Sequence, residues 1–304
     1  MEWKNKKIAI TGVTGQLGSE ICRILGPIAV PLPRHVADLN KPTAVANTIE
    51  QLRPDAVINC AGWTAVDDAE AASTECYAVN ALAVGEIAKA CNKIQATLVQ
   101  VSTDYVFGAD KNRFTPFSET DPPGPLNVYG ASNLAGEGAA TTAVRHLVIR
   151  TSGLYSAGEA GIVRGRNFAD TMLSLAKDQD VVRVVSDQQC TPSFVPHVAK
   201  GILELLMLGE KGVFHVVNNG STTWHAFATE LFRLSAKTTA VDEIATDKYP
   251  TAAQRPLYSV LATKKFGSTT GSSLPDWKAG LREYVQARKT QDVGSGETKC
   301  TQCL

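Results

Sequence analysis

The sequence predicts an α/β fold with a doubly wound parallel sheet and a smaller, partly interleaved α/β lobe. Three observations support this prediction. Short runs rich in Ile and Val alternate with longer helical patterns through the first half of the chain. A glycine-rich turn joins the first such run to the first helical pattern. After Arg150 the alternation loosens, and a chain of 304 residues has room for a second lobe because single cores stop growing near ~250–300 residues.

The first half alternates strand and helix in a regular order. The expected strands are 8–10, 28–32, 56–59, 97–102 and 147–150. The expected helices are 16–25, 42–52, 69–93 and 134–143. Alternation at this spacing is typical of parallel sheets covered by helices on both faces, and such sheets bind ligands at the carboxyl ends of their strands.

The glycine-rich turn is the first candidate site. Strand 8–10 runs into TGVTGQLGSE, which places Gly12, Gly15 and Gly18 three residues apart. Glycines allow a tight turn and close backbone approach, and the following helix directs its positive N-terminus at a pyrophosphate. The spacing is GxxGxxG rather than GxGxxG. We therefore predict a Rossmann-type dinucleotide site, whose contacts at this turn are Gly12, Thr14, Gly15, Gln16, Leu17 and Gly18.

The end of the second strand indicates which dinucleotide fits. An NAD-binding protein places an acidic residue there to bind the ribose 2′-hydroxyl. Here the strand leads into Arg34 and His35, and the first acidic residue is Asp38. A basic residue favours the 2′-phosphate of NADPH, while NADH and a merely solvated Arg34 stay open as alternatives. Asp38 and Leu39 are expected to flank the adenine.

The chain divides at the point where the alternation loosens. Residues 1–150 are the expected dinucleotide-binding Rossmann domain. Residues 151–289, with expected strands 181–185 and 213–217, form a mixed substrate-binding lobe with segments that return to the Rossmann core. Residues 290–304 are polar and featureless, so we expect a disordered tail.

Composition limits the partners and the compartment. Lys and Arg number 30 and Asp and Glu number 30, which argues against nucleic acid or an anionic membrane as the main partner. The N-terminus has no apolar signal-peptide core, and no apolar stretch approaches the ~20 residues that span a bilayer. The seven cysteines are odd in number and scattered apart from Cys300 and Cys303 in the tail, so we expect reduced thiols and a cytoplasmic location.

Three further segments carry a family resemblance: NCAGWTAVDDAE (59–70), VSTDYVF (101–107) and NVYGASNLAGE (127–137). Together with TGVTGQLG they resemble the extended short-chain dehydrogenase/reductase superfamily and, within it, the dTDP-4-dehydrorhamnose reductase family. The resemblance covers nearly the whole chain except the tail. It continues through NFADTML (167–173), DQQCTPS (187–193), GVFHVVNNGSTTWHAFA (212–228) and QRPLYSVLATKKFG (254–267).

The resemblance implies an enzyme of nucleotide-sugar and cell-surface polysaccharide biosynthesis. Its reaction would be NADPH-dependent reduction of the C4 ketone of dTDP-4-dehydro-L-rhamnose to dTDP-L-rhamnose. A nucleotide sugar is then the expected partner, and a homodimer is compatible with the resemblance. Further cofactor contacts are expected at Ala61, Gly62, Asn80 and Ser102.

The catalytic groups of that family are a Thr, a Tyr and a Lys, the last two in a YxxxK spacing. By resemblance, Thr103 orients the substrate carbonyl and Tyr129 gives it a proton. The lysine would hold the cofactor ribose and make the tyrosine more acidic, but the fourth residue after Tyr129 is Asn133. Asn can still hydrogen bond a ribose hydroxyl, and it carries no charge. We therefore expect slower proton donation without its complete loss.

The resemblance also implies substrate contacts. Those near the sugar are Asp104, Tyr105 and Val106, and those near the nucleotide are Asn167 and Phe168. Arg255 is expected to pair with the substrate diphosphate through two parallel hydrogen bonds. Two positions depart from the family pattern: Gly153 stands where the family has Trp, and Tyr258 stands where it has Asn.

Two other interpretations remain open. Asn133 is compatible with an NADP-binding regulatory or non-catalytic homologue, like the regulatory subunit of methionine adenosyltransferase. Gly153 and Tyr258 are compatible with a reductase of another nucleotide 4-ketosugar. Retention of Tyr129 beside Thr103 favours an enzyme. No metal site is predicted, since no His, Cys and Asp cluster has ligand spacing; Mg²⁺ is associated with some relatives, but no ligands for it are identified here.

Overall fold

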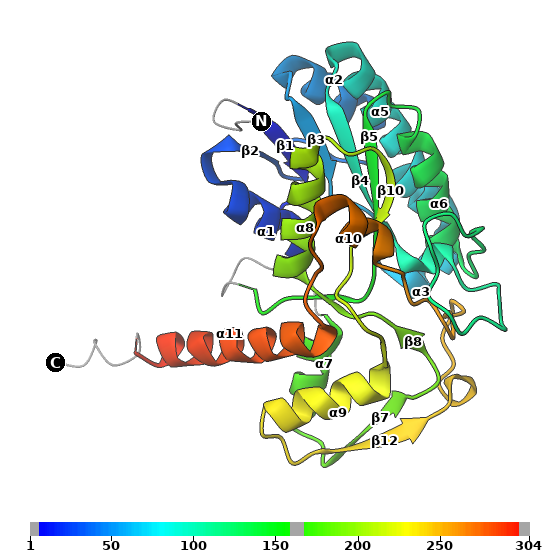
Figure 1. Ribbon diagram of the computed structural model, residues 1–304, viewed down its shortest axis with the longest axis vertical. Helices are drawn as coiled ribbons and strands as arrows, with labels where there is room; N and C mark the ends of the chain where they lie inside the picture. The colour runs from blue at the N-terminus through cyan, green and yellow to red at the C-terminus, as the bar shows by residue number, and fades with distance from the viewer. Residues whose placement is uncertain (1–5, 159–166, 298–304) are drawn as a thin grey trace.

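A six-stranded parallel sheet forms the centre of the molecule, with the strand order β10-β5-β4-β3-β1-β2. The computed structural model describes residues 6–158 and 167–297 (Figure 1). This architecture confirms the predicted α/β class. The sheet strands are β1 (Ile8–Thr11), β2 (Ala29–Leu32), β3 (Ala56–Asn59), β4 (Thr97–Thr103), β5 (His146–Thr151) and β10 (Gly212–His215).

Helices cover both faces of this sheet. In Figure 1, α1, α8 and α10 lie on one side of it, and α2, α5 and α6 lie on the other. The helices of this part are α1 (Gln16–Leu25), α2 (Pro42–Leu52), α3 (Val66–Ala71), α4 (Ser73–Tyr77), α5 (Ala83–Ile94), α6 (Val128–Ala140), α8 (Val195–Leu208) and α10 (Lys264–Thr270). Short turns are η1 (Gly26–Ile28), the π-helical η2 (Ala78–Leu82), η3 (Asp104–Val106) and η4 (Thr246–Lys248).

The strand sequences explain why the sheet is buried on both faces. Ile8 and Ile10 belong to the core beneath α1 and α8, whereas Ala9 between them belongs to the core beneath α2 and α5. Ile58 and Val57 divide in the same way. Successive side chains of a strand point to opposite faces, so a continuous apolar run is needed when helices cover both.

The expected single helix over 69–93 is wrong. The chain breaks at Ala72 between α3 and α4, and a π-helical turn, η2, separates α4 from α5. Asn80 lies in η2, and its amide is hydrogen-bonded to both backbone groups of Trp63 in the loop after β3. The extra residue of a π turn places this side chain under that loop, which helical periodicity alone does not predict.

The expected helix over 134–143 begins earlier, at Val128, and ends at Ala140. Asn127 is its N-cap, and the side-chain Oδ1 of Asn127 accepts a hydrogen bond of 2.8 Å from Gly130 N. Such a cap satisfies a backbone donor that has no partner inside the helix. The earlier start places Tyr129 in the first turn of α6, at the carboxyl edge of the sheet.

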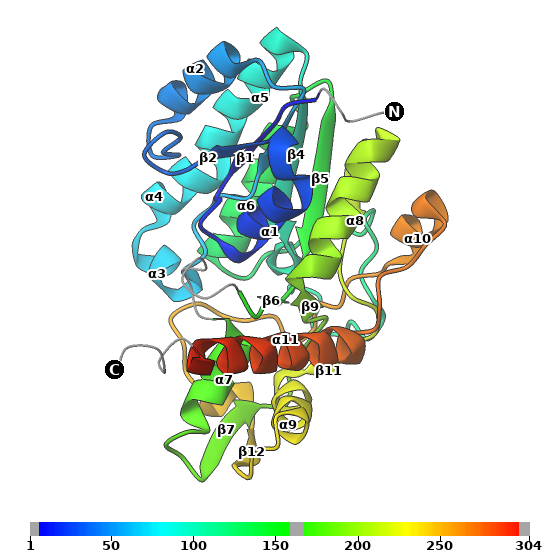
Figure 2. The ribbon, with the colours of Figure 1, turned by 90° about the vertical axis from the view of Figure 1, so that its left-hand side faces the viewer.

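The second lobe packs below that edge, as Figure 2 shows. Its core contains aromatic side chains from several elements, among them Tyr155, Phe194, Phe227 and Trp277. Its helices are α7 (Phe168–Leu175), α9 (Trp224–Leu234) and α11 (Trp277–Glu297). Its strands are β6 (Leu154–Tyr155), β7 (Val181–Val185), β8 (Gln189–Cys190), β9 (Ser193–Phe194), β11 (Thr222–Thr223) and β12 (Ala240–Ile244).

The interleaving of the two parts takes a definite form. Strand β7 pairs with β12 inside the lobe, whereas β10 leaves it and joins β5 as the edge strand of the main sheet. The segment 212–215 therefore belongs to the sheet, and 216–217 lie outside the strand. The exact division of the chain at 150 and 289 stays a prediction.

The expected disordered tail from Thr290 is wrong for residues 290–297, because α11 extends to Glu297. Trp277, Leu281 and Tyr284 anchor the first half of this helix in the lobe core. A helix that has been nucleated in this way extends by one hydrogen bond per added residue. The remaining residues 298–304, which include Cys300 and Cys303, lie outside the described residues.

Candidate active site

The glycine-rich turn lies at the carboxyl end of β1. Gly12 has a φ of +66°, and a Cβ on it would lie 2.7 Å from Ala61 N and from the carbonyl group of Cys60. A Cβ on Gly18 would lie 2.4 Å from Gly12 O. Both glycines are therefore required for close backbone packing, Gly12 against the loop after β3 and Gly18 between α1 and the turn.

The first turn of α1 provides the expected anion site. Gly15 is the N-cap, so helix geometry leaves the N–H groups of Gln16, Leu17 and Gly18 without helical partners. The Leu17 side chain is buried in the core, so only its backbone is available to a ligand, and Thr14 is exposed beside it. Backbone donors and the helix dipole together favour a phosphate at this position.

The Gln16 side chain has a second role. Its Oε1 accepts hydrogen bonds of 3.0 Å from Ser156 Oγ and from Asn167 Nδ2. Asn167 also caps α7, since its Oδ1 accepts a 2.9 Å bond from Asp170 N. The predicted cofactor residue Gln16 and the predicted substrate residue Asn167 are thus brought into direct contact, and they join the two lobes.

The residues after β2 lie on the surface near this turn. Arg34 forms an ion pair of 3.5 Å with Asp38, and the Arg34 side chain is 79% exposed. Hydrogen bonds from Asn40 hold the pKa of Asp38 below its ordinary value, so this side chain is an anion beside Arg34 at neutral pH. Leu39 is buried in the core. An exposed guanidinium is able to reach a 2′-phosphate, although Asp38 competes for it.

Two predicted cofactor residues act inside the fold. The Asn80 amide donates to Ser132 Oγ at 3.0 Å and holds the loop that contains Ala61 and Gly62. Ser102 Oγ donates a 2.6 Å hydrogen bond to Glu137 Oε1. Asn80 and Ser102 therefore position neighbouring backbone, and their polar side-chain groups are already occupied.

A buried ion pair between Arg150 and Glu137 links the end of β4 to α6. Arg150 donates to both carboxylate oxygens of Glu137 at 2.7 and 2.9 Å, and both side chains are about 5% exposed. Glu137 also accepts from Ser102, the residue before Thr103. The pair thus fixes the end of β4 relative to α6, which carries Tyr129.

Thr103 and Tyr129 are brought together as predicted. Both side chains line one pocket, where the Thr103 hydroxyl favours the ionised form of Tyr129, and Thr103 Oγ1 accepts a 3.2 Å bond from Tyr105 N. Burial raises the pKa of Tyr129 to about 12, and the nearby Asp104 acts in the same direction. Tyr129 is consequently a neutral hydroxyl at physiological pH, the form that gives a proton.

Asp104 is a buried acid next to this pair. Its Oδ1 accepts from Thr103 Oγ1 at 3.3 Å, and its Oδ2 accepts from Ser259 Oγ at 2.6 Å. Burial raises the pKa of the Asp104 carboxyl to about 6, although these hydroxyls favour its ionised form. A pocket of about 160 Å³ is lined by Thr103, Asp104, Tyr105 and Tyr129, among others.

Val106 lies away from this pocket. Its side chain is fully buried in a small core with Phe107 and Phe117, and its carbonyl accepts from Gly124 N. Its neighbour Tyr105 lines the pocket instead, and the Tyr105 ring lies 5.7 Å from that of Tyr129. The prediction of a sugar contact therefore has no support from the placement of the Val106 side chain.

Asn133 does not reproduce a lysine. Its Nδ2 donates a 2.9 Å hydrogen bond back to the carbonyl of Tyr129, four residues earlier on α6. The amide is therefore tied to the helix itself. The electrostatic neighbours of Tyr129 are Asp104 and Cys76, and neither is a cation.

A second pocket of about 310 Å³ adjoins the first, and both are lined by Gln188 and Trp224. Phe168 lies in the second pocket, where its ring packs 4.6 Å from that of Trp224. Arg255 also lines it, but forms a two-hydrogen-bond ion pair with Asp67. This pair holds the pKa of Asp67 down, at about 2. Arg255 is thus at the expected place with a protein partner already bound.

The two positions that depart from the family pattern have structural explanations. A Cβ on Gly153 would lie 3.0 Å from the Trp224 ring, so an aromatic side chain from α9 fills the space beside Gly153. Trp224 thus supplies an aromatic ring beside Gly153, and it lines the pocket. Tyr258 packs near Phe117 in the small core and does not contribute to the lining of the first pocket.

Several lining residues were not singled out in the sequence. Gln188 lies in the loop before β8, and Gln189 and Cys190 form β8. Trp224 begins α9, and Asp67 is the second residue of α3. All five lie within segments that carry the family resemblance. Only their position in those segments could have pointed to these residues. Contacts between residues so distant in sequence leave no local sequence pattern.

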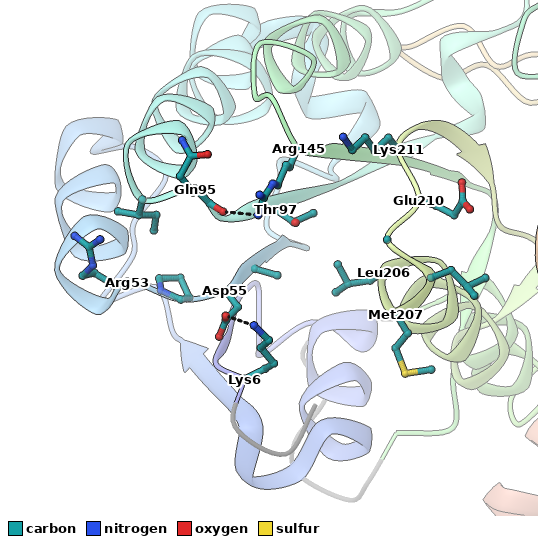
Figure 3. A pocket seen from close by; sticks show the side chains of 15 residues that line it. Lys6, Arg53, Asp55, Gln95, Thr97, Arg145, Leu206, Met207, Glu210 and Lys211 are labelled. Atoms are coloured by element: carbon teal, nitrogen blue, oxygen red, sulfur yellow. Dashed lines mark hydrogen bonds and ion pairs between the residues drawn. The ribbon is translucent and has the colours of Figure 1, made fainter. Parts of the chain in front are cut away.

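A third pocket lies elsewhere, at the amino edge of the sheet. It measures about 470 Å³ and is lined by Lys6, Asp55, Arg145 and Leu206, among others (Figure 3). Lys6 pairs with Asp55, and Arg145 donates to the carbonyl of Gln95.

Within residues 6–158 and 167–297, no group of three or more His, Cys, Asp or Glu is placed to hold a metal ion. No helix of the described chain is long and apolar enough to cross a membrane.

Comparison with known proteins identifies the family of the chain. Residues 6–290 match the family described as RmlD substrate binding domain. A dTDP-4-dehydrorhamnose reductase from Burkholderia thailandensis is 38% identical, with 90% of this chain and 95% of the relative covered. A crystal structure of a dTDP-4-dehydrorhamnose reductase from Clostridium acetobutylicum has a TM-score of 0.88 at 34% identity, covering 93% and 99% of the two chains. The Bacillus anthracis enzyme of that name, solved in complex with NADP, has a TM-score of 0.87 at 32% identity, covering 93% and 99%.

The fold and the Thr103–Tyr129 pair define a Rossmann-type oxidoreductase of the short-chain dehydrogenase/reductase class. The chain belongs to the RmlD substrate binding domain family, the family of the dTDP-4-dehydrorhamnose reductases. This membership confirms the resemblance found in the sequence.

Proposed function

We propose that this protein reduces the C4 ketone of dTDP-4-dehydro-L-rhamnose to give dTDP-L-rhamnose, with NADPH as the reductant. The observation that carries the proposal is that Thr103 and Tyr129 line one pocket together with the buried acid Asp104. The names of its relatives support the same reaction. They support it over a regulatory or non-catalytic role.

Each catalytic side chain has a definite task in this reaction. NADPH, when bound, supplies a hydride to the ketone carbon. Tyr129 donates its hydroxyl proton to the ketone oxygen, and Thr103 holds that oxygen by a hydrogen bond. The walls around the pair exclude bulk water, which strengthens both hydrogen bonds.

The rest of the substrate fits the adjoining pocket. Phe168 and Trp224 offer aromatic faces to a nucleobase, and Arg183 and Arg255 offer cations to a diphosphate. Arg255 has five N–H donors, so Asp67 does not exhaust its capacity. Residues of both pockets come from both lobes, which matches a substrate that is half sugar and half nucleotide.

The cofactor site agrees with a dinucleotide phosphate. The first-turn N–H groups of α1 suit the pyrophosphate, and the exposed Arg34 suits the 2′-phosphate. The NADP complex of the Bacillus anthracis relative supports this assignment. NADH as a second cofactor, the homodimer and Mg²⁺ stay predictions. We also place the protein in the cytoplasm, since Cys22, Cys60, Cys76, Cys91 and Cys190 are free thiols.

The proposal is tested by following NADPH oxidation with dTDP-4-dehydro-L-rhamnose for the wild type, Tyr129→Phe and Asn133→Lys. Tyr129→Phe removes the proton donor, so kcat should fall by about 10²–10⁴-fold. Asn133→Lys places a cation beside Tyr129 and should raise kcat. Tyr258→Phe changes a hydroxyl outside the first pocket and should leave kcat near the wild-type value. NADPH binding without turnover by the wild type or Asn133→Lys would contradict the proposal.

A further inference from the structure

Among the residues that the structure describes, no cation is an electrostatic neighbour of Tyr129 that could supply its next proton. In the proposed reaction its hydroxyl proton goes to the substrate, and the phenolate must regain a proton before the next turnover. Its electrostatic neighbours in the structure are Asp104 and Cys76. Asn133 is bound to the carbonyl of Tyr129 and has no proton to give at neutral pH.

A row of polar side chains leads from Tyr129 to a buried acid. Tyr129 and Thr103 line one pocket, where the Thr103 hydroxyl acts on the pKa of Tyr129, and Thr103 Oγ1 lies 3.3 Å from Asp104 Oδ1. The second carboxyl oxygen of Asp104 is held at 2.6 Å by Ser259 Oγ. Tyr105 N also donates a 3.2 Å hydrogen bond to Thr103 Oγ1. These contacts restrict the side chains of Thr103 and Asp104.

We infer that Asp104 reprotonates Tyr129 through the Thr103 hydroxyl, and that this relay stands in for the lysine absent at position 133. The inference rests on the proposed function. The ketone gains a hydride at carbon and the Tyr129 proton at oxygen. The phenolate then takes the Thr103 proton while Thr103 takes the proton of the Asp104 carboxyl. Asp104, which lines the pocket, regains its proton from water entering there after product leaves.

The surroundings of Asp104 suit this task. Burial keeps the pKa of the carboxyl at about 6, so it exchanges protons near neutral pH, whereas an exposed aspartate is almost fully ionised there. The titratable groups that face it are Tyr105 from its own turn, Tyr129 from α6 and Cys190 from β8. None of these is a cation at neutral pH, so none holds the carboxyl permanently ionised.

The kinetic test is a double-mutant cycle with Asp104→Asn and Asn133→Lys in the full-length enzyme. Asp104→Asn keeps the shape and the hydrogen bonds but has no acidic proton. Its kcat should fall by about 10²-fold with KM nearly unchanged, and by less than about tenfold when Asn133→Lys is also present. An equal loss in both backgrounds, or a change in KM alone, would overturn the relay. Asp121→Asn, at a carboxylate bound to Arg113 and Ser118, is the matched control with wild-type kcat expected.

The pH dependence separates a relay from a structural role. Reduction through the relay needs protonated Asp104, so wild-type kcat should decline as the pH rises above about 6. Asn133→Lys should move this decline to higher pH, since a lysine stays protonated up to about pH 10. A decline that stays in place in Asn133→Lys would speak against the relay.

A titration without substrate distinguishes failure of the relay from failure of the proposed function. The infrared carbonyl band of protonated Asp104, assigned by its loss in Asp104→Asn, gives the midpoint directly. Thr103→Val removes a donor to the carboxylate and should raise this midpoint. If the Asp104 midpoint is unchanged in Thr103→Val while the wild type turns over, the relay is contradicted and the reductase function is not. If the midpoint shifts but the wild type does not turn over, the reductase function is contradicted.

Discussion

The two edges of the parallel sheet carry pockets of opposite character. The amino-edge pocket is larger, about 470 Å³, and the C-caps Arg53, Gln95 and Gly209 of three helices line it. The carboxyl-edge pocket measures about 160 Å³ and contains the Thr103–Tyr129 pair and Asp104. The smaller pocket is the one with convergent hydroxyls and a buried acid.

The difference teaches that the groups lining a pocket, and not its volume, identify the site, since the two adjoining carboxyl-edge pockets measure about 160 and 310 Å³. Helix C-termini carry partial negative charge, so cations such as Arg53, Arg145 and Lys211 near the amino edge have a structural explanation. At the carboxyl edge, β1 ends beside the N-terminus of α1, and the buried Asp104 carboxylate accepts from the Thr103 and Ser259 hydroxyls. Matched substitutions at the two edges make the comparison testable.

The largest expected contrast concerns ion pairs. Arg150→Met leaves Glu137 buried without its cation, which should reduce the free energy of unfolding by about 3–5 kcal/mol. Lys6→Met breaks the pair with Asp55 at the amino edge, where both side chains are 39% exposed, and should cost about 0–1 kcal/mol. Urea unfolding of both variants measures the difference. Equal losses would mean that the two edges are not distinguished by burial.

A second contrast concerns two glycines with positive φ. Gly12→Ala introduces a Cβ 2.7 Å from backbone atoms, so we expect a loss of about 2–3 kcal/mol and at least a tenfold weaker NADPH affinity. Gly209 at the amino edge has a φ of +75° with open space around it, so Gly209→Ala should cost only about 1 kcal/mol. Its NADPH affinity should stay at the wild-type value, as measured by fluorescence titration. A comparable loss of affinity in Gly209→Ala would contradict the separation of the two edges.

The sequence was most informative where structure depends on neighbouring residues. The strands of the main sheet, the glycine-rich turn and the helix after it follow from local patterns, and these were predicted. Thr103 and Tyr129 were predicted only through the family resemblance, since 26 positions separate them and no periodicity links them. The π turn at Asn80 and the Trp224 ring beside Gly153 were missed, because each depends on packing against a segment distant in sequence.

The smallest expected effect lies at the rim of the carboxyl edge, at the pair of Asp67 and Arg255. The pair holds the folded-state pKa of Asp67 at about 2, below the value of about 3.9 in an unfolded chain. A lowered pKa stabilises the fold above the unfolded value, and this contribution is lost as the pH falls through 2.

Because Asp67 is 42% exposed, solvent screening limits the contribution to about 1 kcal/mol. Asp67→Asn should therefore unfold at lower urea concentration than the wild type at pH 7, and the gap should close as the pH approaches 2. A gap that persists at low pH would show that Asp67 stabilises the fold through packing rather than charge. The rim would then resemble the amino edge, where charges contribute little, and Arg255 would be free to serve the substrate alone.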